Sequence, residues 1–397
     1  MGIKNHIRNS LLYRPWRFYR EHQRVARFET LLDSMHAPGR VLYLYDEKSI
    51  RDRFAALAAE RRRITANRKP GVAAFGTREW EDKGLWQSFS RNSDFSLYDY
   101  VLSGGLSSHG RHNPDKKLQQ LLGVEFLSHI RERDSDGRPV DIAFFYASGA
   151  YIDTKMICEL KRLGIWTVLL GLDDKQQLPG PPIGNLKDWQ LDASRSVDIY
   201  WTTWRTGVKW LASHGANPWY SPPAADPEYF RPLGLSRDID VLWIGSAYGR
   251  RMEFIRYLRH RGFNVMAYGP GWKDGFVPFE DAVRLINRAK VVLGMGGVGH
   301  TEQFKHLKGR DFEIPMCGAV YLTSYNPEIT DHFVVGEEIL CFSSYVECAD
   351  LLHFILRRPH DMERIRDAAR NRSMRDHTWE KRINELLRFF PGDVPKQ

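Results

Sequence analysis

The feature that most constrains the fold is a strand–helix–strand succession in the middle of the chain. An apolar run at 141–146 is followed by a helical pattern that starts near Asp153 and stops at Gly164, and then by a second apolar run at 166–170. A helix that joins two strands at this spacing is typical of a βαβ unit, in which the strands are parallel. The sequence therefore predicts an α/β fold built on a parallel sheet.

The alternation starts again after a proline-rich segment. Residues 221–235 carry four prolines and are expected to link two domains. Beyond this linker the sequence predicts strands at 240–244, 264–268, 291–293, 319–322 and 339–342, a helix at 278–289, a helix opened by a capping box at 344–347, and a last helix at 378–390. At 397 residues the chain is long enough for two domains with separate cores.

The region before the first βαβ unit gives weaker signals. Residues 41–45 predict a first strand, and Ile50, Phe54 and Leu57 recur at helical spacing after it. Residues 65–140 are polar and rich in glycine and serine, so we expect long loops there.

The first forty residues are strongly basic. Eight Lys and Arg residues stand against three acidic ones, with Tyr13, Trp16, Phe18 and Tyr19 interleaved. Pro15 suits the first turn of a helix. Such a helix would rest on an anionic lipid surface, or it would be a solvated helix docked on its own domain.

Composition narrows the classes of function. A formal net charge of +9 favours an anionic partner, which would be a nucleotide sugar, an acidic lipid surface or nucleic acid. The alternative is an ordinary excess of arginine on the surface. The four cysteines form no C-x-x-C pair, which argues against a disulfide framework or a zinc site. No apolar run is long enough to span a membrane, and the start of the chain lacks the apolar core of a signal peptide. We expect a cytoplasmic protein.

The segment 305–328 contains the parts of a nucleotide-diphosphate site. Lys305, Lys308 and Arg310 bring positive charge to a loop-to-helix junction, where anions are favoured. Glu313 follows, and a carboxylate can accept two hydrogen bonds from the diol of a ribose.

The same residues carry a family resemblance. Residues 308–318, followed by Tyr-Leu-Thr and then by Gly336-Glu-Glu-Ile, resemble the C-terminal half of GT-B glycosyltransferases of the spore-maturation-protein (CgeB-like) group. The likeness is good over 238–385 and weaker over 140–230. Related GT-B enzymes have an E-x7-E motif whose first acid serves the donor sugar and whose second serves the ribose. Glu313 falls at the second position, and Lys305 stands at the first.

Two glycine-rich turns are further donor-site candidates. Gly245, with Arg250 close behind it, follows the strand at 240–244, where a backbone without side chains can approach phosphate oxygens. The alternative is an ordinary strand-to-helix turn. Residues 294–299 match G-x-G-x-x-G, but three strands into the domain this pattern does not favour a dinucleotide site. We expect a loop that carries Gly297 and His300 towards the donor.

Asp173 and Asp174 stand at the carboxyl end of the predicted strand 166–170, the edge where ligands bind in α/β sheets. Either acid would serve as a base towards an acceptor hydroxyl, ligate a metal or cap a turn.

The resemblance implies a GT-B fold, in which two doubly wound Rossmann-like domains face a central cleft. The expected parts are a basic helical segment (1–40), an acceptor-side domain (41–225), a nucleotide-sugar domain (236–376) and a C-terminal helix crossing back (377–397). The implied function is a metal-independent glycosyltransferase without a cofactor, with a glycan, lipid-linked or protein acceptor and no nucleic-acid partner. The alternative is an inactive GT-B module at an anionic membrane surface.

Overall fold

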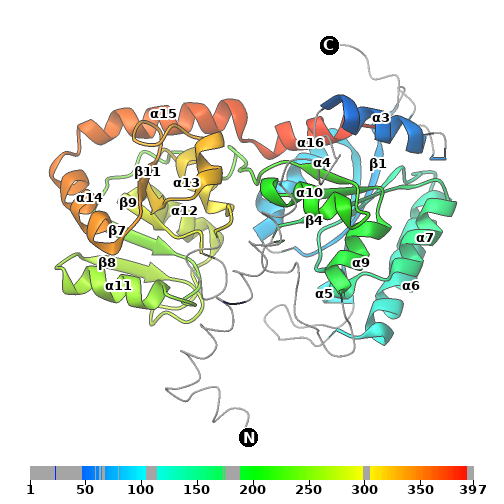
Figure 1. The fold of residues 1–397 in the computed structure, drawn as a ribbon, viewed down its shortest axis with the longest axis horizontal. Coiled ribbons are helices and arrows are strands. Elements are labelled where there is room, and N and C mark those ends of the chain that lie inside the picture. Colours follow the sequence, from blue (N-terminus) through cyan, green and yellow to red (C-terminus); the bar gives the residue numbers. More distant parts are fainter. Residues whose placement is uncertain are drawn as a thin grey trace, which may run out of the picture. The chain divides into compact units, whose positions relative to one another are not determined.

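The computed structural model describes residues 23, 47–58, 60–61, 64, 68–78, 80–103, 114–172, 174, 188–297 and 305–390. The expected strand at 41–45 and the basic segment 1–40, apart from Gln23, lie outside this set. The described residues divide into two compact units. The N-terminal unit runs from residue 47 to Asp226 and includes 379–390, and the C-terminal unit runs from Pro227 to Thr378 (Figure 1).

The N-terminal unit is built on a parallel sheet. Its described strands are β1 (Gly71–Gly76), β2 (Asp94–Asp99), β3 (Ile142–Phe145), β4 (Trp166–Gly171), β5 (Ile199–Thr202) and β6 (Pro218–Tyr220), in the order β2-β1-β3-β4-β5-β6. The helices of this unit are α3 (Glu47–Ala58), α4 (Leu85–Asn92), α5 (Tyr100–Ser103), α6 (Lys116–Ser135), α7 (Thr154–Arg162), α9 (Trp189–Ser196), α10 (Val208–Ser213) and α16 (Trp379–Leu387), with short turns η1 (Trp80–Lys83), η2 (Gly149–Tyr151) and η3 (Arg205–Gly207).

The predicted βαβ unit is confirmed. β3 and β4 pair in parallel, and α7 joins them. Asp153 caps α7 by accepting a hydrogen bond from the Lys155 N–H at 3.0 Å. Gly164 ends this helical segment with φ 77°, a conformation that favours glycine.

The expectation of long loops over 65–140 is wrong. This stretch contains β1, β2, α4 and the twenty-residue helix α6. β1 escaped notice because its sequence, GVAAFG, is made largely of small residues, although the strand is fully buried. α6 buries Leu122, Phe126 and Ile130, one residue per turn, which leaves most of its surface polar.

The C-terminal unit has a second parallel sheet. Within the described part of the chain its strands are β7 (Ile239–Ile244), β8 (Val265–Tyr268), β9 (Ala289–Gly294), β10 (Tyr321–Ser324) and β11 (Leu340–Phe342), in the order β11-β10-β9-β7-β8. The helices are α11 (Arg251–His260), α12 (Phe279–Arg288), α13 (Arg310–Met316), α14 (Tyr345–Arg357) and α15 (Asp361–Asp376), with η4 (Pro327–Asp331).

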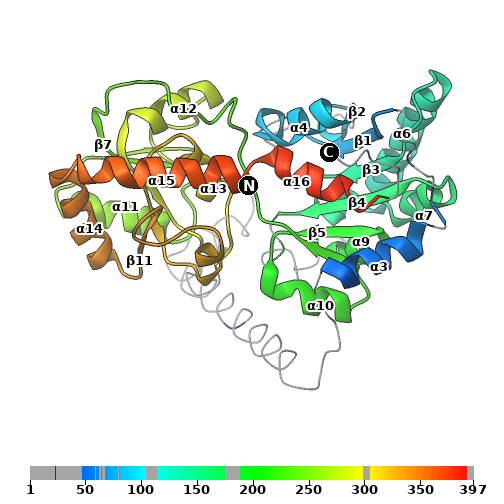
Figure 2. The same ribbon diagram turned by 90° about the horizontal axis from the view of Figure 1, so that it is seen from above.

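The helices of this unit cover both faces of the sheet. α11 and α14 contact each other over one face, and α12 covers the other (Figure 2). α14 begins with the predicted capping box: the Ser344 hydroxyl accepts from the Glu347 N–H, and the Glu347 carboxylate accepts from the Ser343 N–H. The fold is therefore the expected GT-B class, with two doubly wound α/β units.

The chain returns to the N-terminal unit at its end. α16 packs against α4, and Trp379 donates its N–H to the Ala225 carbonyl at 3.1 Å. Ile383 and Leu386 of α16 are buried in the core of this unit. None of the helices in the described residues combines the length and the apolar character that a membrane span requires.

Candidate functional site

The topology of the C-terminal sheet points to one edge. From β7 the chain first moves to β8 and then returns to β9 on the other side of β7. The loops that leave the carboxyl ends of β7 and β9 therefore diverge, and ligands of open α/β sheets bind at such a switch point. Gly245 follows β7 at this edge, and Gly294 ends β9.

Gly245 is held in a conformation that only glycine adopts readily. Its φ is 144°, and its carbonyl accepts hydrogen bonds from the indole N–H groups of Trp243 (3.0 Å) and Trp272 (2.7 Å). A Cβ at this position would lie 2.8 Å from Nη1 of Arg310. Two tryptophans thus hold the Gly245 carbonyl, and the guanidinium of Arg310 lies against the side of the glycine where a Cβ would be.

Arg310 brings a positive charge to the switch point. It is the first residue of α13, and it donates from Nη1 to the Ile244 carbonyl at 3.2 Å. Its guanidinium also lies 5.6 Å from the ring of Trp243. Sequence spacing could not place Arg310 beside Gly245, because the two residues are 65 positions apart and meet only through the order of the strands.

The two arginines after the glycine turn differ in their surroundings. Arg251 is buried, lies 3.9 Å from the Tyr248 ring centroid and donates to the Ser246 carbonyl at 3.1 Å, so it stabilises the turn. Arg250 is partly exposed and pairs with Glu253 at 2.9 Å. Arg250 is therefore the arginine of this pair that a ligand can reach.

The first turn of α13 places its acids inward. Asp311 is buried and accepts hydrogen bonds from the Lys308 N–H (2.7 Å) and the Tyr321 hydroxyl (2.6 Å). Burial raises the pKa of the Asp311 carboxyl above its usual range. Glu313 is 8% exposed, and its Oε1 lies 2.8 Å from the place that a Cβ on Gly309 would occupy. Lys308 and Arg310 are partly exposed, so the cations face solvent more than the acids do.

The described residues of the G-x-G-x-x-G stretch, 294–297, lie at the end of β9 and directly after it. The Gly296 N–H donates to the Ser324 hydroxyl at 3.1 Å, and Gly297 forms an antiparallel bridge with Lys305. α13 begins only at Arg310. Gly297 therefore lies at the carboxyl end of β9, as expected, whereas His300 lies outside the described residues.

Asp174 lies at the carboxyl edge of the N-terminal sheet but is fully buried. Its Oδ1 accepts from the Tyr200 hydroxyl at 2.5 Å, and its Oδ2 accepts from the Thr202 hydroxyl. Burial also raises the pKa of Tyr200 well above its usual range, so the phenol stays a donor. This environment favours a structural role for Asp174 over proton transfer. Asp173 lies outside the described residues.

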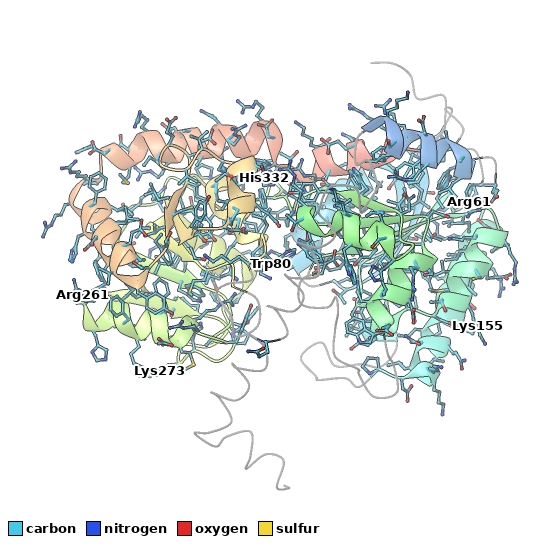
Figure 3. All side chains as sticks on the ribbon, in the orientation of Figure 1. Arg61, Trp80, Lys155, Arg261, Lys273 and His332 are labelled. Carbon is cyan, nitrogen blue, oxygen red and sulfur yellow. The ribbon has the colours of Figure 1, made fainter. Side chains whose placement is uncertain are left out.

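The N-terminal sheet has its own switch point, between β1 and β3, which sequence reasoning missed. Thr77 follows β1; its hydroxyl donates to the Glu81 carboxylate at 3.2 Å, and its backbone carbonyl accepts from the Trp86 indole N–H at 2.7 Å. Trp80 is 39% exposed at the start of η1 (Figure 3). An exposed aromatic beside a carboxylate offers a flat apolar surface and a hydrogen-bond acceptor to a ligand. In the sequence, the signal for this site is Trp80, which comes four residues after the strand β1.

Within the described residues, no group of three or more His, Cys, Asp and Glu side chains has the arrangement of a metal site. Arg310 brings a positive charge to the C-terminal switch point, and Arg250 and Lys308 are partly exposed cations in the segments after β7 and before α13.

Comparisons with known proteins agree with this architecture. Residues 250–388 match the family model described as glycosyl transferase-like. No curated protein sequence matches the chain. Among solved structures, sucrose-phosphate synthase from Thermosynechococcus elongatus is similar, with a TM-score of 0.56, 11% identity, and coverage of 80% of this chain and 98% of that chain.

Two other structures show the same fold. Anabaena HepE in complex with UDP-glucose has a TM-score of 0.54 and 12% identity, and the match covers 80% of this chain and 99% of that one. AviGT4, a glycosyltransferase involved in avilamycin A biosynthesis, has a TM-score of 0.51 and 14% identity, covering 81% and 97%. The match to the glycosyl transferase-like family thus covers most of the C-terminal unit, and the chain shares the GT-B fold of these solved structures.

Proposed function

We propose that the protein transfers a glycosyl group from a nucleoside diphosphate sugar, and that its C-terminal unit holds the diphosphate at the β7–β9 switch point. The observation that carries this proposal is the guanidinium of Arg310 against Gly245. A glycine lets phosphate oxygens approach the backbone, and the arginine beside it supplies fixed positive charge.

The roles of the other residues follow from their positions. Negative charge develops on the leaving diphosphate as the glycosidic bond breaks, and preorganised cations stabilise it. Arg310 is our candidate for this task, together with two partly exposed cations: Arg250, which follows Gly245 in the sequence, and Lys308, which precedes Arg310. Glu313 is our candidate for the ribose diol. Because these side chains carry the charge, we propose that transfer needs no metal ion.

A uridine nucleotide is the first candidate for the donor. HepE, which shares the fold, has been crystallised with UDP and with UDP-glucose. Because HepE is only 12% identical to this chain, its ligand serves as a starting hypothesis, and the panel of nucleotides described below tests it.

We place the chain with the CgeB-like group on the residues 308–318 and 336–339 that resemble it. The acceptor would be a glycan, a lipid-linked sugar or a protein, bound by the N-terminal unit. Asp173, next to the buried Asp174, is the candidate base for an inverting transfer. The described cysteines, including the exposed Cys158, are free thiols, which suits the cytoplasm or the inner face of a membrane.

A thermal-shift panel tests the donor site. UDP, GDP, CDP and dTDP are added with magnesium or with EDTA to the wild type and to Arg310→Gln. At about 100 times Kd a ligand adds roughly 2.7 kcal/mol to the free energy of unfolding, so the melting temperature rises measurably. We expect one nucleotide to stabilise the wild type with or without magnesium and to lose its effect in the variant.

The matched control is Arg288→Gln. Arg288 pairs with Asp238 at 2.5 Å, ahead of the amino ends of β9 and β7, at the opposite edge of the same sheet. This variant should respond to the nucleotide as the wild type does. A wild type that none of the four nucleotides stabilises would contradict the proposed function, and a magnesium requirement would contradict the metal-free mechanism.

A further inference from the structure

Asp311 closes the turn that carries Arg310. The Asp311 N–H donates to the Lys308 carbonyl at 2.9 Å, and the Lys308 N–H donates back to Oδ2 of Asp311 at 2.7 Å. Gly309 and Arg310 are the two residues between these bonds. A reciprocal pair of hydrogen bonds at the start of a helix fixes the backbone that it encloses, as in a capping box. The direction in which the Arg310 side chain leaves α13 therefore depends on Asp311.

Tyr321 ties this turn to the sheet. Its hydroxyl, on β10, donates to Oδ1 of Asp311 at 2.6 Å. Asp311 is 4% exposed and Tyr321 is 1% exposed, so water cannot readily replace a hydrogen bond lost between them. Burial also raises the pKa of Tyr321 well above its usual range, which keeps the phenol a donor. One carboxyl group thus anchors the start of α13 on β10.

Gly294 makes room for this contact. It lies at the end of β9, opposite Thr323 of the neighbouring strand β10. A Cβ on Gly294 would lie 1.9 Å from the Tyr321 hydroxyl and 2.7 Å from the Thr323 hydroxyl. The Tyr321 hydroxyl can therefore keep its place only beside a residue without a side chain. The first glycine of the G-x-G-x-x-G pattern serves the Tyr321–Asp311 pair.

The other end of the Arg310 side chain is held at β7. Its Nη1 donates to the Ile244 carbonyl at 3.2 Å and lies 2.8 Å from the place of a Cβ on Gly245. Strand β9 lies between β10 and β7 in the sheet, so the arginine reaches from a turn anchored on β10 to the end of β7. A side chain that is held in place before a ligand arrives loses less conformational entropy on binding.

We propose that Asp311 and Tyr321 are positioning residues of the donor site, which act on the diphosphate through Arg310. The inference rests on the proposed function, because it takes Arg310 as the residue that binds the diphosphate. It adds two residues that hold the arginine in its binding position. Since Asp311 is buried, a ligand meets the guanidinium and not the acid that holds its turn.

Isothermal titration of the full chain tests this assignment with whichever nucleotide, among UDP, GDP, CDP and dTDP, stabilises the wild type. We expect Asp311→Ala to bind it at least tenfold more weakly than the wild type does. Tyr321→Phe should show a smaller loss, because Asp311 keeps its bond to the Lys308 N–H. Asp311→Asn should stay close to the wild type: its amide oxygen accepts from Lys308, and its amide nitrogen donates to the Tyr321 hydroxyl, which can also accept.

A double-mutant cycle separates positioning from a loss of stability. Arg310→Gln removes the guanidinium, so the addition of Asp311→Ala should weaken binding at millimolar ligand little further. The matched control is Asn287→Ala. Asn287 is also buried, accepts from the Leu233 N–H at 2.8 Å and lies just before the amino end of β9, at the opposite edge of the sheet. This control should lower the melting temperature and leave the affinity unchanged.

Four results overturn the inference. They are equal or tighter binding by Asp311→Ala, losses that add in the double variant, an affinity in Asp311→Asn as low as in Asp311→Ala, and an unchanged affinity in Tyr321→Phe. The last variant lacks only a hydroxyl group, so it carries the test if Asp311→Ala does not fold. A wild type that binds none of the four nucleotides contradicts the proposed function instead, which keeps the two failures distinguishable.

Discussion

Each unit has a glycine at the carboxyl edge of its sheet, and the space beside the two glycines is filled differently. Beside Gly171, at the end of β4, a Cβ would lie 2.2 Å from Oδ1 of Asp174 and 2.3 Å from the Tyr200 hydroxyl. Both of these residues are fully buried. Beside Gly245, after β7, a Cβ would meet the tip of Arg310 at 2.8 Å. The space beside Gly171 is filled by a buried hydrogen-bonded network. The space beside Gly245 is filled by the end of the flexible Arg310 side chain, whose charge is available to an anion.

The largest expected effect is on stability, at the edge beside Gly171. Gly171→Ala forces a methyl group into buried polar atoms that have no room to move, so we expect the free energy of unfolding of the N-terminal unit to fall by about 3 kcal/mol. Urea unfolding together with hydrogen exchange in β4 measures this loss. Gly123→Ala is the control, since its Cβ would approach Asp153 no closer than 3.2 Å in helix α6. An equal loss in the two variants would contradict the comparison.

At the edge beside Gly245 we expect the main effect on ligand binding and a smaller one on stability. Gly245→Ala displaces the guanidinium of Arg310 and strains a residue with φ 144°, which costs about 1 to 2 kcal/mol. The affinity for the nucleoside diphosphate should fall at least tenfold. Gly275→Ala is the matched control, because Gly275 also has a positive φ, 68°, but no atom lies within 4 Å of its would-be Cβ. If both variants lose affinity equally, strain and not the arginine explains the result.

Substitution of Asp174 tests whether this acid has a structural or a catalytic role. In Asp174→Asn an amide nitrogen replaces one of the two oxygens that accept from Tyr200 and Thr202, so one buried hydroxyl loses its acceptor at a cost of about 1 kcal/mol. We expect the transfer rate of the folded variant to stay within a few-fold of the wild type, with Thr202→Val showing a similar loss of stability. Loss of activity at unchanged stability would instead assign Asp174 as the base.

The sequence predicted the elements better than their order. The βαβ unit at β3–α7–β4 and the strands of the C-terminal unit follow from local patterns of apolar residues, which need no knowledge of partners. β1 was missed because small residues such as Ala73 and Ala74 carry little apolar signal, although they are fully buried.

The site was predictable only in its parts. Gly245 and Arg310 were each named from local chemistry, but their contact depends on β7 lying next to β9, and no local pattern determines the order of strands. Asp174 was placed correctly at a carboxyl edge, but its burial depends on Tyr200 and Thr202, which are 26 and 28 residues away and approach it through strand β5.

The smallest expected effect depends on pH and lies away from both edges. Asp94, at the start of β2, accepts hydrogen bonds from Arg138 and Arg133, and these arginines hold the pKa of its carboxyl below the usual 3.8. Because the folded-state pKa is the lower one, the stabilisation is complete above pH 3.8 and is lost as the pH falls through the folded-state value. The side chain is 36% exposed, so the pair contributes less than about 1 kcal/mol.

Asp94→Asn removes this contribution. Urea midpoints near pH 6 should be lower in the variant than in the wild type, and the difference should shrink as the pH is lowered below about 3.8. Asp238→Asn is the control in the C-terminal unit. Arg288 also lowers the pKa of Asp238, but the Asp238 side chain is 54% exposed, so solvent screening should make the pH-dependent loss of stability smaller. A difference for Asp94 that stays constant across this pH range would mean that the arginines do not act through its charge.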